Sequence, residues 1–264
     1  ALGDRARELL RRIYRPLFLM ETPIVNTSLE TAELTKYAAN AFLAMKISFI
    51  NEIADLCERV GADVHDVARG VGLDGRIGRK FLHPGPGYGG SCFPKDTLAV
   101  ARTARDFNSP LTLIETTIAI NDARKGQMAG RVIAACGGSV AGKTIAVLGL
   151  AFKPETDDMR DAPSLVVVPK LVEAGATVRA YDPVAMDHAK DLLPDTVIYA
   201  TTALDAAAGA DALVVLTEWN EFRALSPAKL RQAMRGVVLE DLRNVYEPET
   251  MREAGFNYRS IGRP

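Results

Sequence analysis

Apolar positions recur at helical spacing over the first half of the chain. An amphipathic helix is predicted at residues 4–15 and a short strand at residues 23–28. Residues 31–60 carry the strongest helical pattern, uninterrupted by Gly or Pro and followed by Gly61 in the position of a C-terminal cap. Its apolar residues are Leu34, Ala38, Ala41, Phe42, Met45, Phe49, Ile53, Leu56, Cys57 and Val60. A helix of about 30 residues is about 45 Å long, more than a small domain needs, and such a helix often supports a dimer interface.

Three more helices are predicted before residue 138. They cover residues 63–70, 97–107 and 111–136, and Pro94 suits the first position of the second of them. The last helix is expected to bury Ile114, Thr117, Ile118, Ile120, Met128, Val132 and Ile133. Glycines at 137 and 138 end it. Residues 31–138 are therefore predicted to form a helical central domain.

The pattern changes after Gly142, where short apolar runs alternate with helical patterns. Strands are predicted at 144–150, 177–181, 196–199, 212–217, 237–241 and 258–261, and helices at 164–173, 185–193, 204–208, 227–234 and 249–254. Buried β-branched strands separated by helices indicate a parallel sheet covered on both faces. The expected fold class is α/β, with a Rossmann-like sheet domain over residues 139–264 that binds ligands at the carboxyl ends of its strands.

Composition narrows the class of protein. A chain of 264 residues, 48% hydrophobic and with net charge -1, is expected to bury a good core and to bind neither nucleic acid nor membrane. Three cysteines are an odd and sparse set, which favours reduced thiols in the cytoplasm. Three scattered histidines give no metal-ligand spacing. Because the chain opens without Met on an amphipathic helix, residues 1–30 are expected to be the remnant of a preceding domain.

The strongest candidate for chemistry is the loop Gly85-Pro86-Gly87-Tyr88-Gly89-Gly90-Ser91-Cys92-Phe93-Pro94-Lys95-Asp96. It delivers a thiol to the start of a helix, where unpaired N–H groups and the helix dipole favour the thiolate. Lys95 adds a cation. Asp96 lies one helical turn after Cys92, so that carboxylate and sulfur can face one cavity, as in an activated nucleophile with a base in reach. The alternative is that Cys92 is a small buried hydrophobe on an ordinary loop.

Other positions are ambiguous from the residues alone. Lys36 and Asn40 share a face of the 31–60 helix, where both could simply be solvated. The basic cluster from Arg76 to Leu82 is either surface or a site for a diphosphate, which the arginine fork matches. The first turn of the sheet, Gly149-Leu150-Ala151-Phe152-Lys153-Pro154, lacks G-x-G-x-x-G, and no such fingerprint occurs elsewhere. The sheet is therefore of nucleotide-binding type without a dinucleotide cradle.

Three of these segments carry a family resemblance. The stretch from Gly89 to Asp96, the pattern Lys36-Tyr37-Ala38-Ala39-Asn40 with the Lys46–Glu52 run, and Gly149 to Pro154 resemble the UDP-glucose/GDP-mannose dehydrogenase family over nearly the whole chain. The resemblance implies oxidation of UDP-glucose to UDP-glucuronate, by two hydride transfers to NAD through a thioester on Cys92. In that scheme Lys36 and Asn40 stabilise charge on the sugar oxygen, and Asp96 assists proton transfer through water.

The resemblance also implies where ligands bind. Substrate contacts are expected from Phe81, Tyr88, Gly89, Phe152, Lys153 and Arg243, and a contact to NAD from Arg160. Arg76 is expected to reach the substrate of the neighbouring subunit. His83 stands where some members of the family have a lysine. The family places NAD on an N-terminal domain, so residues 1–264 alone are expected not to turn over. A homodimer through the 31–60 helix is expected.

Two alternatives stay open. Related enzymes oxidise GDP-mannose or UDP-N-acetylmannosamine, and the Phe after Cys92 together with the Lys46–Glu52 run favours UDP-glucose. A protein of another class, a non-catalytic UDP-sugar-binding and dimerisation module, is also consistent with these residues.

Overall fold

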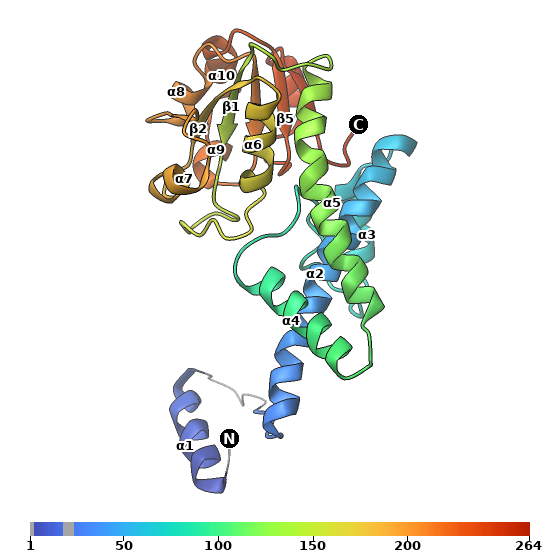
Figure 1. Ribbon diagram of the computed structural model, residues 1–264. Coiled ribbons are helices and arrows are strands. Elements are labelled where there is room, and N and C mark those ends of the chain that lie inside the picture. The colour runs from blue at the N-terminus through green and yellow to red at the C-terminus, as the bar shows by residue number, and fades with distance from the viewer. Residues whose placement is uncertain (1–2, 18–23) are drawn as a thin grey trace.

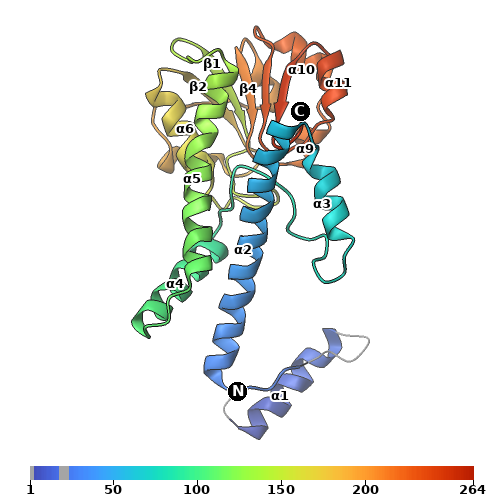
Figure 2. The same cartoon turned by 90° about the vertical axis from the view of Figure 1, so that its right-hand side faces the viewer.

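A bundle of long helices leads into a parallel sheet in the computed structural model, which describes residues 3–17 and 24–264 (Figures 1 and 2). The first half consists of α1 (Asp4–Tyr14), a 3-10 turn η1 (Arg15–Leu17), α2 (Leu29–Val60), α3 (Val64–Gly72), α4 (Cys92–Asp106) and α5 (Thr112–Ala135). The predicted strand at 23–28 is wrong for residues 24–28, which pair with no strand of the described chain, and residue 23 lies outside the described residues.

The ends of α2 follow from local chemistry. Ser28 caps its N-terminus by accepting a hydrogen bond from the Thr31 N–H at 3.2 Å. Gly61 takes the left-handed conformation at φ 75° and donates its N–H to the Cys57 carbonyl, which confirms the predicted cap. The helix is long because nothing in its 32 residues breaks it.

The second half is a six-stranded parallel sheet in the order β3-β2-β1-β4-β5-β6. Its strands are β1 (Thr144–Leu148), β2 (Thr177–Tyr181), β3 (Ile198–Tyr199), β4 (Ala212–Val215), β5 (Val238–Asp241) and β6 (Asn257–Ser260). The helices between them are α6 (Ser164–Glu173), α7 (Met186–Leu192), α8 (Ala203–Ala207), α9 (Asn220–Arg223), α10 (Pro227–Ala233) and α11 (Pro248–Glu253). The order is that of a Rossmann sheet, which confirms the predicted fold class. Only α9 was not predicted, because four residues are too short to show a helical period.

The two faces of the sheet bury different sets of residues. Alternation along β1 sends Ile145 and Val147 to one face and Ala146 and Leu148 to the other. The first face packs against residues of α6 and α7 and also against α5 and α2, so that one hydrophobic core runs from the sheet into the long helices. The second face is covered by α8 to α11.

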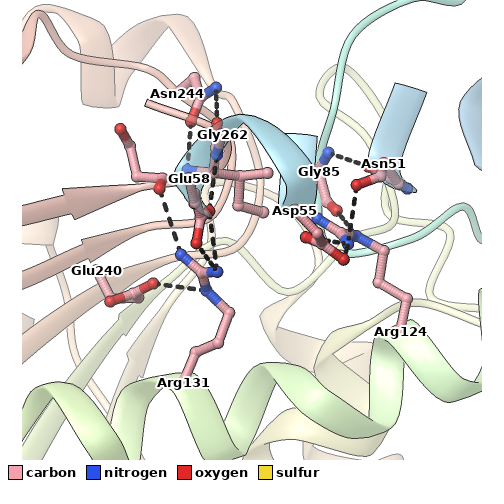
Figure 3. A network of polar contacts seen from close by, with 11 residues as sticks. Asn51, Asp55, Glu58, Gly85, Arg124, Arg131, Glu240, Asn244 and Gly262 are labelled. Carbon is pink, nitrogen blue, oxygen red and sulfur yellow. Dashed lines mark hydrogen bonds and ion pairs between the residues drawn. The ribbon is translucent and has the colours of Figure 1, made fainter. Parts of the chain in front are cut away.

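An ion-pair network on α5 joins the long helices to the sheet (Figure 3). Arg131 pairs with Glu240 of β5 at 3.0 Å and with Glu58 of α2 at 2.9 Å. Glu58 also accepts the N–H of Gly262 at 2.8 Å. Burial raises the pKa of Glu240, and the charge and hydrogen bond of Arg131 offset part of that rise. Arg131 therefore fixes the orientation of the sheet on α2 and α5.

Candidate functional site

Cys92 is the first residue of α4, at the end of the glycine-rich loop 85–91. Its side chain is a free, exposed thiol, and Sγ lies 3.7 Å from the hydroxyl of Ser91. The helix begins five residues before the predicted start at Thr97, because Pro94 falls in its first turn, where no N–H is required. The sulfur therefore belongs to the first turn itself, where the N–H groups have no intrahelical partner.

A chain of polar contacts links α2 to α4 beside this turn. Lys36 Nζ donates to Asn40 Oδ1 at 3.2 Å, and Asn40 Nδ2 donates to Asp96 Oδ2 at 2.5 Å. The other oxygen of Asp96 accepts from Lys95 Nζ at 2.7 Å. Asn40 and Asp96 are buried, whereas Lys36 and Lys95 are exposed. The structure thus brings Lys36, Asn40 and Asp96 together, with Cys92 one helical turn before Asp96.

The environment of Asp96 favours its ionised form. Burial by itself raises the pKa of Asp96, but the hydrogen bonds from Lys95 and Asn40, with the charges of Lys95 and Lys36, outweigh it and leave the pKa below its ordinary value. Its partner Lys95 has a raised pKa, first because of that hydrogen bond. At neutral pH Asp96 is therefore a carboxylate, able to accept a proton.

We expect Asp96→Asn to lower the Tm at pH 7 and to matter less in acid. A carboxylate with a lowered folded-state pKa stabilises the fold above its unfolded pKa, and this contribution is lost as the pH falls through the folded value. The difference in Tm between the parent and Asp96→Asn, followed by calorimetry from neutral to acid pH, should therefore become smaller once the pH falls below the ordinary pKa of a carboxyl group. The exposed Asp106 of the same helix gives the control, Asp106→Asn. A difference that widens in acid would contradict this reading.

The segment between β1 and α6 lies directly against the glycine-rich loop 85–91, called the thiol loop from here on. The N–H of Gly90 donates to the Arg160 carbonyl at 2.7 Å. A Cβ on Gly90 would come within 2.7 Å of the Phe152 ring, and one on Gly89 would overlap the carbonyl oxygen of Asp161. Glycine is required at both positions because only a bare backbone allows this approach. Arg160 is exposed, and its pKa is raised first by the hydrogen bond to Asp158 and then by the charge of that carboxylate.

Phe152, Lys153 and Arg243 meet at the carboxyl ends of the strands. Lys153 Nζ lies 5.3 Å from the centre of the Phe152 ring. Arg243, two residues after β5, donates Nη2 to the Phe152 carbonyl at 3.1 Å and Nε to the carbonyl of Leu216 at 2.8 Å. Its Nη1 would lie 3.3 Å from a Cβ on Gly85, so Arg243 also touches the thiol loop. It is a held cation at a strand end, not a solvated one.

Aromatic side chains surround Phe93, the second residue of α4. The Phe93 ring centre lies 5.9 Å from that of Phe81 and 6.0 Å from that of Tyr88. Tyr88 is buried, and this burial raises its pKa to about 12. Phe81 has φ 65°, a left-handed conformation that costs on the order of 1–3 kcal/mol for such a residue. Strain of this kind is concentrated at functional sites.

Arg76 is not brought into this group of residues. Its side chain is 89% exposed, and its guanidinium bonds Asp74 in the turn after α3, with Nη2 to Oδ2 at 2.5 Å. Lys46 of α2 holds the same turn by donating to the carbonyls of Ile77 and Gly78. His83 is exposed. The side-chain contacts of Arg76 are thus with its own turn and not with Cys92 or its neighbours.

Three buried polar residues that contact the loop were missed by the sequence reasoning. They are Asn51 on α2 and Asn121 and Arg124 on α5. A signal was present: Asn121 and Arg124 continue the helical period between Thr117 and Met128, both predicted to be buried. Buried polar residues on an apolar stripe need partners, and here the partners are backbone groups of the loop.

The first turn of the sheet does not fit a dinucleotide. Asp182, directly after β2, accepts the N–H groups of Leu150 and Ala151 at 2.7 and 3.1 Å. These amides follow β1, where a dinucleotide-binding fold offers N–H groups to a pyrophosphate. Here a carboxylate of the chain already occupies them. Within residues 3–17 and 24–264, no cluster of three or more potential ligands could hold a metal ion, and no helix has the length and apolarity to cross a membrane.

Two family models match this chain. Residues 30–123 match the central domain of the UDP-glucose/GDP-mannose dehydrogenase family, and residues 146–248 match its UDP binding domain. The thiol loop lies within the first match, and Phe152, Lys153 and Arg243 lie within the second.

Individual relatives agree with the family models. A UDP-glucose 6-dehydrogenase from Rhizobium meliloti (strain 1021) is 60% identical over 98% of this chain and 59% of its own length. One from Bacillus subtilis (strain 168) is 47% identical over 99% of this chain and 56% of its own. The structure of a UDP-glucose dehydrogenase from Pyrobaculum islandicum superposes with a TM-score of 0.86 at 36% identity, over 99% of this chain and 57% of that one. The chain thus spans less than three fifths of the length of these relatives.

Proposed function

Because this chain belongs to the UDP-glucose/GDP-mannose dehydrogenase family, we propose that it carries the thiol and sugar-nucleotide half of an enzyme that oxidises UDP-glucose to UDP-glucuronate. The observation that supports this most directly is the junction at Cys92. An exposed thiol opens a helix whose next turn joins Asn40 and Lys36, and the segment holding Phe152 and Arg160 covers its loop.

Oxidation of a primary alcohol to an acid removes two hydrides and passes through an aldehyde. We propose that Cys92 Sγ adds to the aldehyde carbon and forms a C–S bond, while the carbonyl oxygen takes a proton and becomes the hydroxyl of a thiohemiacetal. Loss of the second hydride and of the hydroxyl proton leaves a thioester. Water then cleaves the C–S bond, which releases the carboxylate and restores the thiol. Covalent capture keeps the aldehyde from escaping.

The polar chain beside Cys92 supports this chemistry. Lys36 is exposed and lies within hydrogen-bonding distance of Asn40, so its ammonium and the Asn40 amide can stabilise negative charge on the sugar oxygen. Asp96 is ionised at neutral pH and accepts from Asn40, and we assign it the proton transfer through water. Lys95 compensates its charge.

The sugar nucleotide is proposed to bind at the carboxyl ends of the strands. Arg243 and Lys153 offer cations to a diphosphate. Tyr88 and the bare backbone of Gly89 belong to the loop, Phe152 packs against it and Phe81 lies beside Phe93. A ligand between Arg243 and Cys92 would place its diphosphate on the sheet and its sugar at the sulfur. Arg76, which pairs with Asp74 of its own turn, is proposed to reach the substrate of the neighbouring subunit across a dimer.

NAD is the hydride acceptor that the family suggests. When bound, it supplies the two-electron sink for each oxidation. The sheet of this chain does not fit it, because Asp182 occupies the amides of the first turn. Arg160, exposed beside the thiol loop, is the one described residue that we assign to a contact with the cofactor. The steps proposed for this chain are therefore those at Cys92 and its neighbours.

The reaction is tested by its stoichiometry. The protein that carries this chain, supplied with limiting UDP-glucose and excess NAD, should form two NADH per sugar and yield UDP-glucuronate by mass spectrometry. UDP-N-acetylmannosamine and GDP-mannose, run in parallel, should react more slowly. One NADH per sugar, or faster oxidation of either parallel substrate, would overturn the proposed reaction or its substrate. UDP binding without any oxidation would identify a non-catalytic binding module instead.

We propose in addition that the chain forms a homodimer through α2. Its large apolar residues Phe42, Phe49 and Leu56 repeat every seventh position, and all three lie 48–57% exposed. A stripe of this kind along one helix is typical of an interface between helices. The three cysteines are free thiols, which is consistent with the cytoplasmic location that we propose.

Phe49→Glu should convert the dimer to a monomer. A carboxylate at the centre of an apolar helix interface would be buried without a partner, which costs several kcal/mol per site. Sedimentation equilibrium measures the mass of the assembly directly. Leu192→Glu is the control, because Leu192 is equally exposed at the end of α7 but lies away from α2. A dimer that survives Phe49→Glu but not Leu192→Glu would place the interface on the sheet.

A further inference from the structure

The backbone of the thiol loop is held by side chains of α2 and α5. The N–H of Gly85 donates to Asn51 Oδ1 at 2.8 Å, and its carbonyl accepts from Arg124 Nε at 2.6 Å. Asn121 takes both polar groups of Tyr88, accepting its N–H at 2.8 Å and donating to its carbonyl at 3.1 Å. A buried loop must satisfy its N–H and C=O groups, and here three side chains do so at two residues.

Burying these polar side chains costs free energy, and the packing of the helices alone does not require it. Asn51, Asn121 and Arg124 are only 1%, 3% and 4% exposed. Burial lowers the pKa of Arg124, and Asp55 keeps the guanidinium charged by pairing with Nη1 at 2.9 Å (Figure 3). Apolar residues would pack the same helices at no such cost. What the polar residues provide is a fixed position for the loop backbone.

The loop has little freedom between its two anchors. Gly87 adopts φ 112°, and a Cβ there would lie 2.9 Å from Lys125 Cγ and 3.0 Å from Asn121 Oδ1. The loop is thus pressed onto α5 with no space for a side chain. Tyr88, the second anchored residue, precedes Cys92 by four positions, so a shift of the loop on α5 shifts the sulfur.

Helix α5 also fixes the other side of the proposed site. Arg131 lies seven residues after Arg124 and pairs with Glu240 on β5, the strand that leads to Arg243. Figure 3 shows both arginines rising from α5, Arg124 toward Gly85 and Arg131 toward the sheet. One rigid helix therefore sets the position of the thiol loop relative to the strand ends.

We propose that Asn121 and Arg124, with Asn51, are positioning residues that hold loop 85–91 and thereby place Cys92 Sγ for attack. As a statement about catalysis this rests on the proposed function, whereas the placement of the thiol can be measured without turnover. None of the three touches the sulfur. They act through the loop backbone.

The test uses Asn121→Ala and Arg124→Lys in the protein that carries this chain. Arg124→Lys keeps the cation beside Asp55 but removes the rigid fork that reaches Gly85. If the loop is loosened, we expect kcat for UDP-glucose to fall about 10- to 100-fold, the effect of an ångström-scale misplacement, with KM changed less than about threefold. Independently, the rate of Cys92 alkylation by iodoacetamide, followed by peptide mass spectrometry, should change about fivefold or more, because a loosened loop alters the exposure and the surroundings of the sulfur.

Thr117→Val is the matched control. Thr117 is as buried on the same helix, and its hydroxyl donates to the Leu113 carbonyl within α5. Thr117→Val should change neither kcat nor the rate of Cys92 alkylation, even if it lowers the Tm as much as Asn121→Ala does. An unchanged alkylation rate in Asn121→Ala would overturn the proposal, and so would a changed alkylation rate with unchanged kcat. If the parent protein does not oxidise UDP-glucose, the proposed function fails, and alkylation alone decides whether these residues place the thiol. Asn121→Ala decides the matter if Arg124→Lys does not fold.

Discussion

Cys92→Ala should reduce oxidation of UDP-glucose at least about a thousandfold, as expected when a covalent nucleophile is removed. The second oxidation needs the carbon held as a thiohemiacetal, and no other thiol lies on the loop. NADH formation measures the loss. UDP binding by calorimetry should stay nearly unchanged, because Lys153 and Arg243 lie on the sheet segment and not on α4.

Cys136→Ala is the matched control for that variant. Cys136 is also a free thiol and directly follows α5, but it is half-buried, and burial raises its pKa. It should retain full activity. After a rapid acid quench during turnover, or with a slow substrate, intact-protein mass spectrometry should find the sugar bound to the parent and to Cys136→Ala but not to Cys92→Ala. Activity of Cys92→Ala within tenfold of the parent would exclude the thioester.

Local signals in the sequence predicted most of the elements. Helix α6 and strand β2 have the predicted bounds, because the glycine turn between them interrupts the apolar pattern on both sides. The cap at Gly61 was predictable because a glycine directly after a periodic apolar run commonly ends a helix in the left-handed conformation. The start of α4 was not, because Pro94 marks only the first turn of a helix and not its first residue.

The candidate site was predictable only within each helix. Spacing places Lys36 beside Asn40 and Cys92 one turn before Asp96, but nothing local shows that Asn40 bonds Asp96, 56 residues away. The family resemblance placed these residues in one active site but did not predict that hydrogen bond. The residues that hold the loop were not predicted, because a search for periodic apolar positions does not identify polar residues on the same face of the helix. Asn121 and Arg124 occupy core positions of α5, and their partners are backbone groups that carry no sequence signal.

The burial of charge on α5 explains why the sheet and the long helices form one unit. Two arginines on one helix each lose water and regain partners from different parts of the chain: Arg124 from α2 and the thiol loop, Arg131 from α2, β5 and β6. Burying either arginine costs free energy unless all of its partners are in place. The arrangement therefore makes the geometry between thiol and strand ends depend on the complete fold.

Arg131→Met should lower the free energy of unfolding at pH 7 by about 3 kcal/mol, the usual cost of leaving a buried charge without its partner. Glu240 is 1% exposed and would lose its counter-ion. A carboxyl with a raised folded pKa carries its penalty above that pKa and loses it on protonation, so the defect should shrink as the pH falls. Urea unfolding of both proteins from pH 7 to pH 5 measures this. The double variant Arg131→Met/Glu240→Gln should recover at least half of the loss, whereas a double variant no more stable than Arg131→Met would show that packing, and not the unpaired carboxylate, causes it.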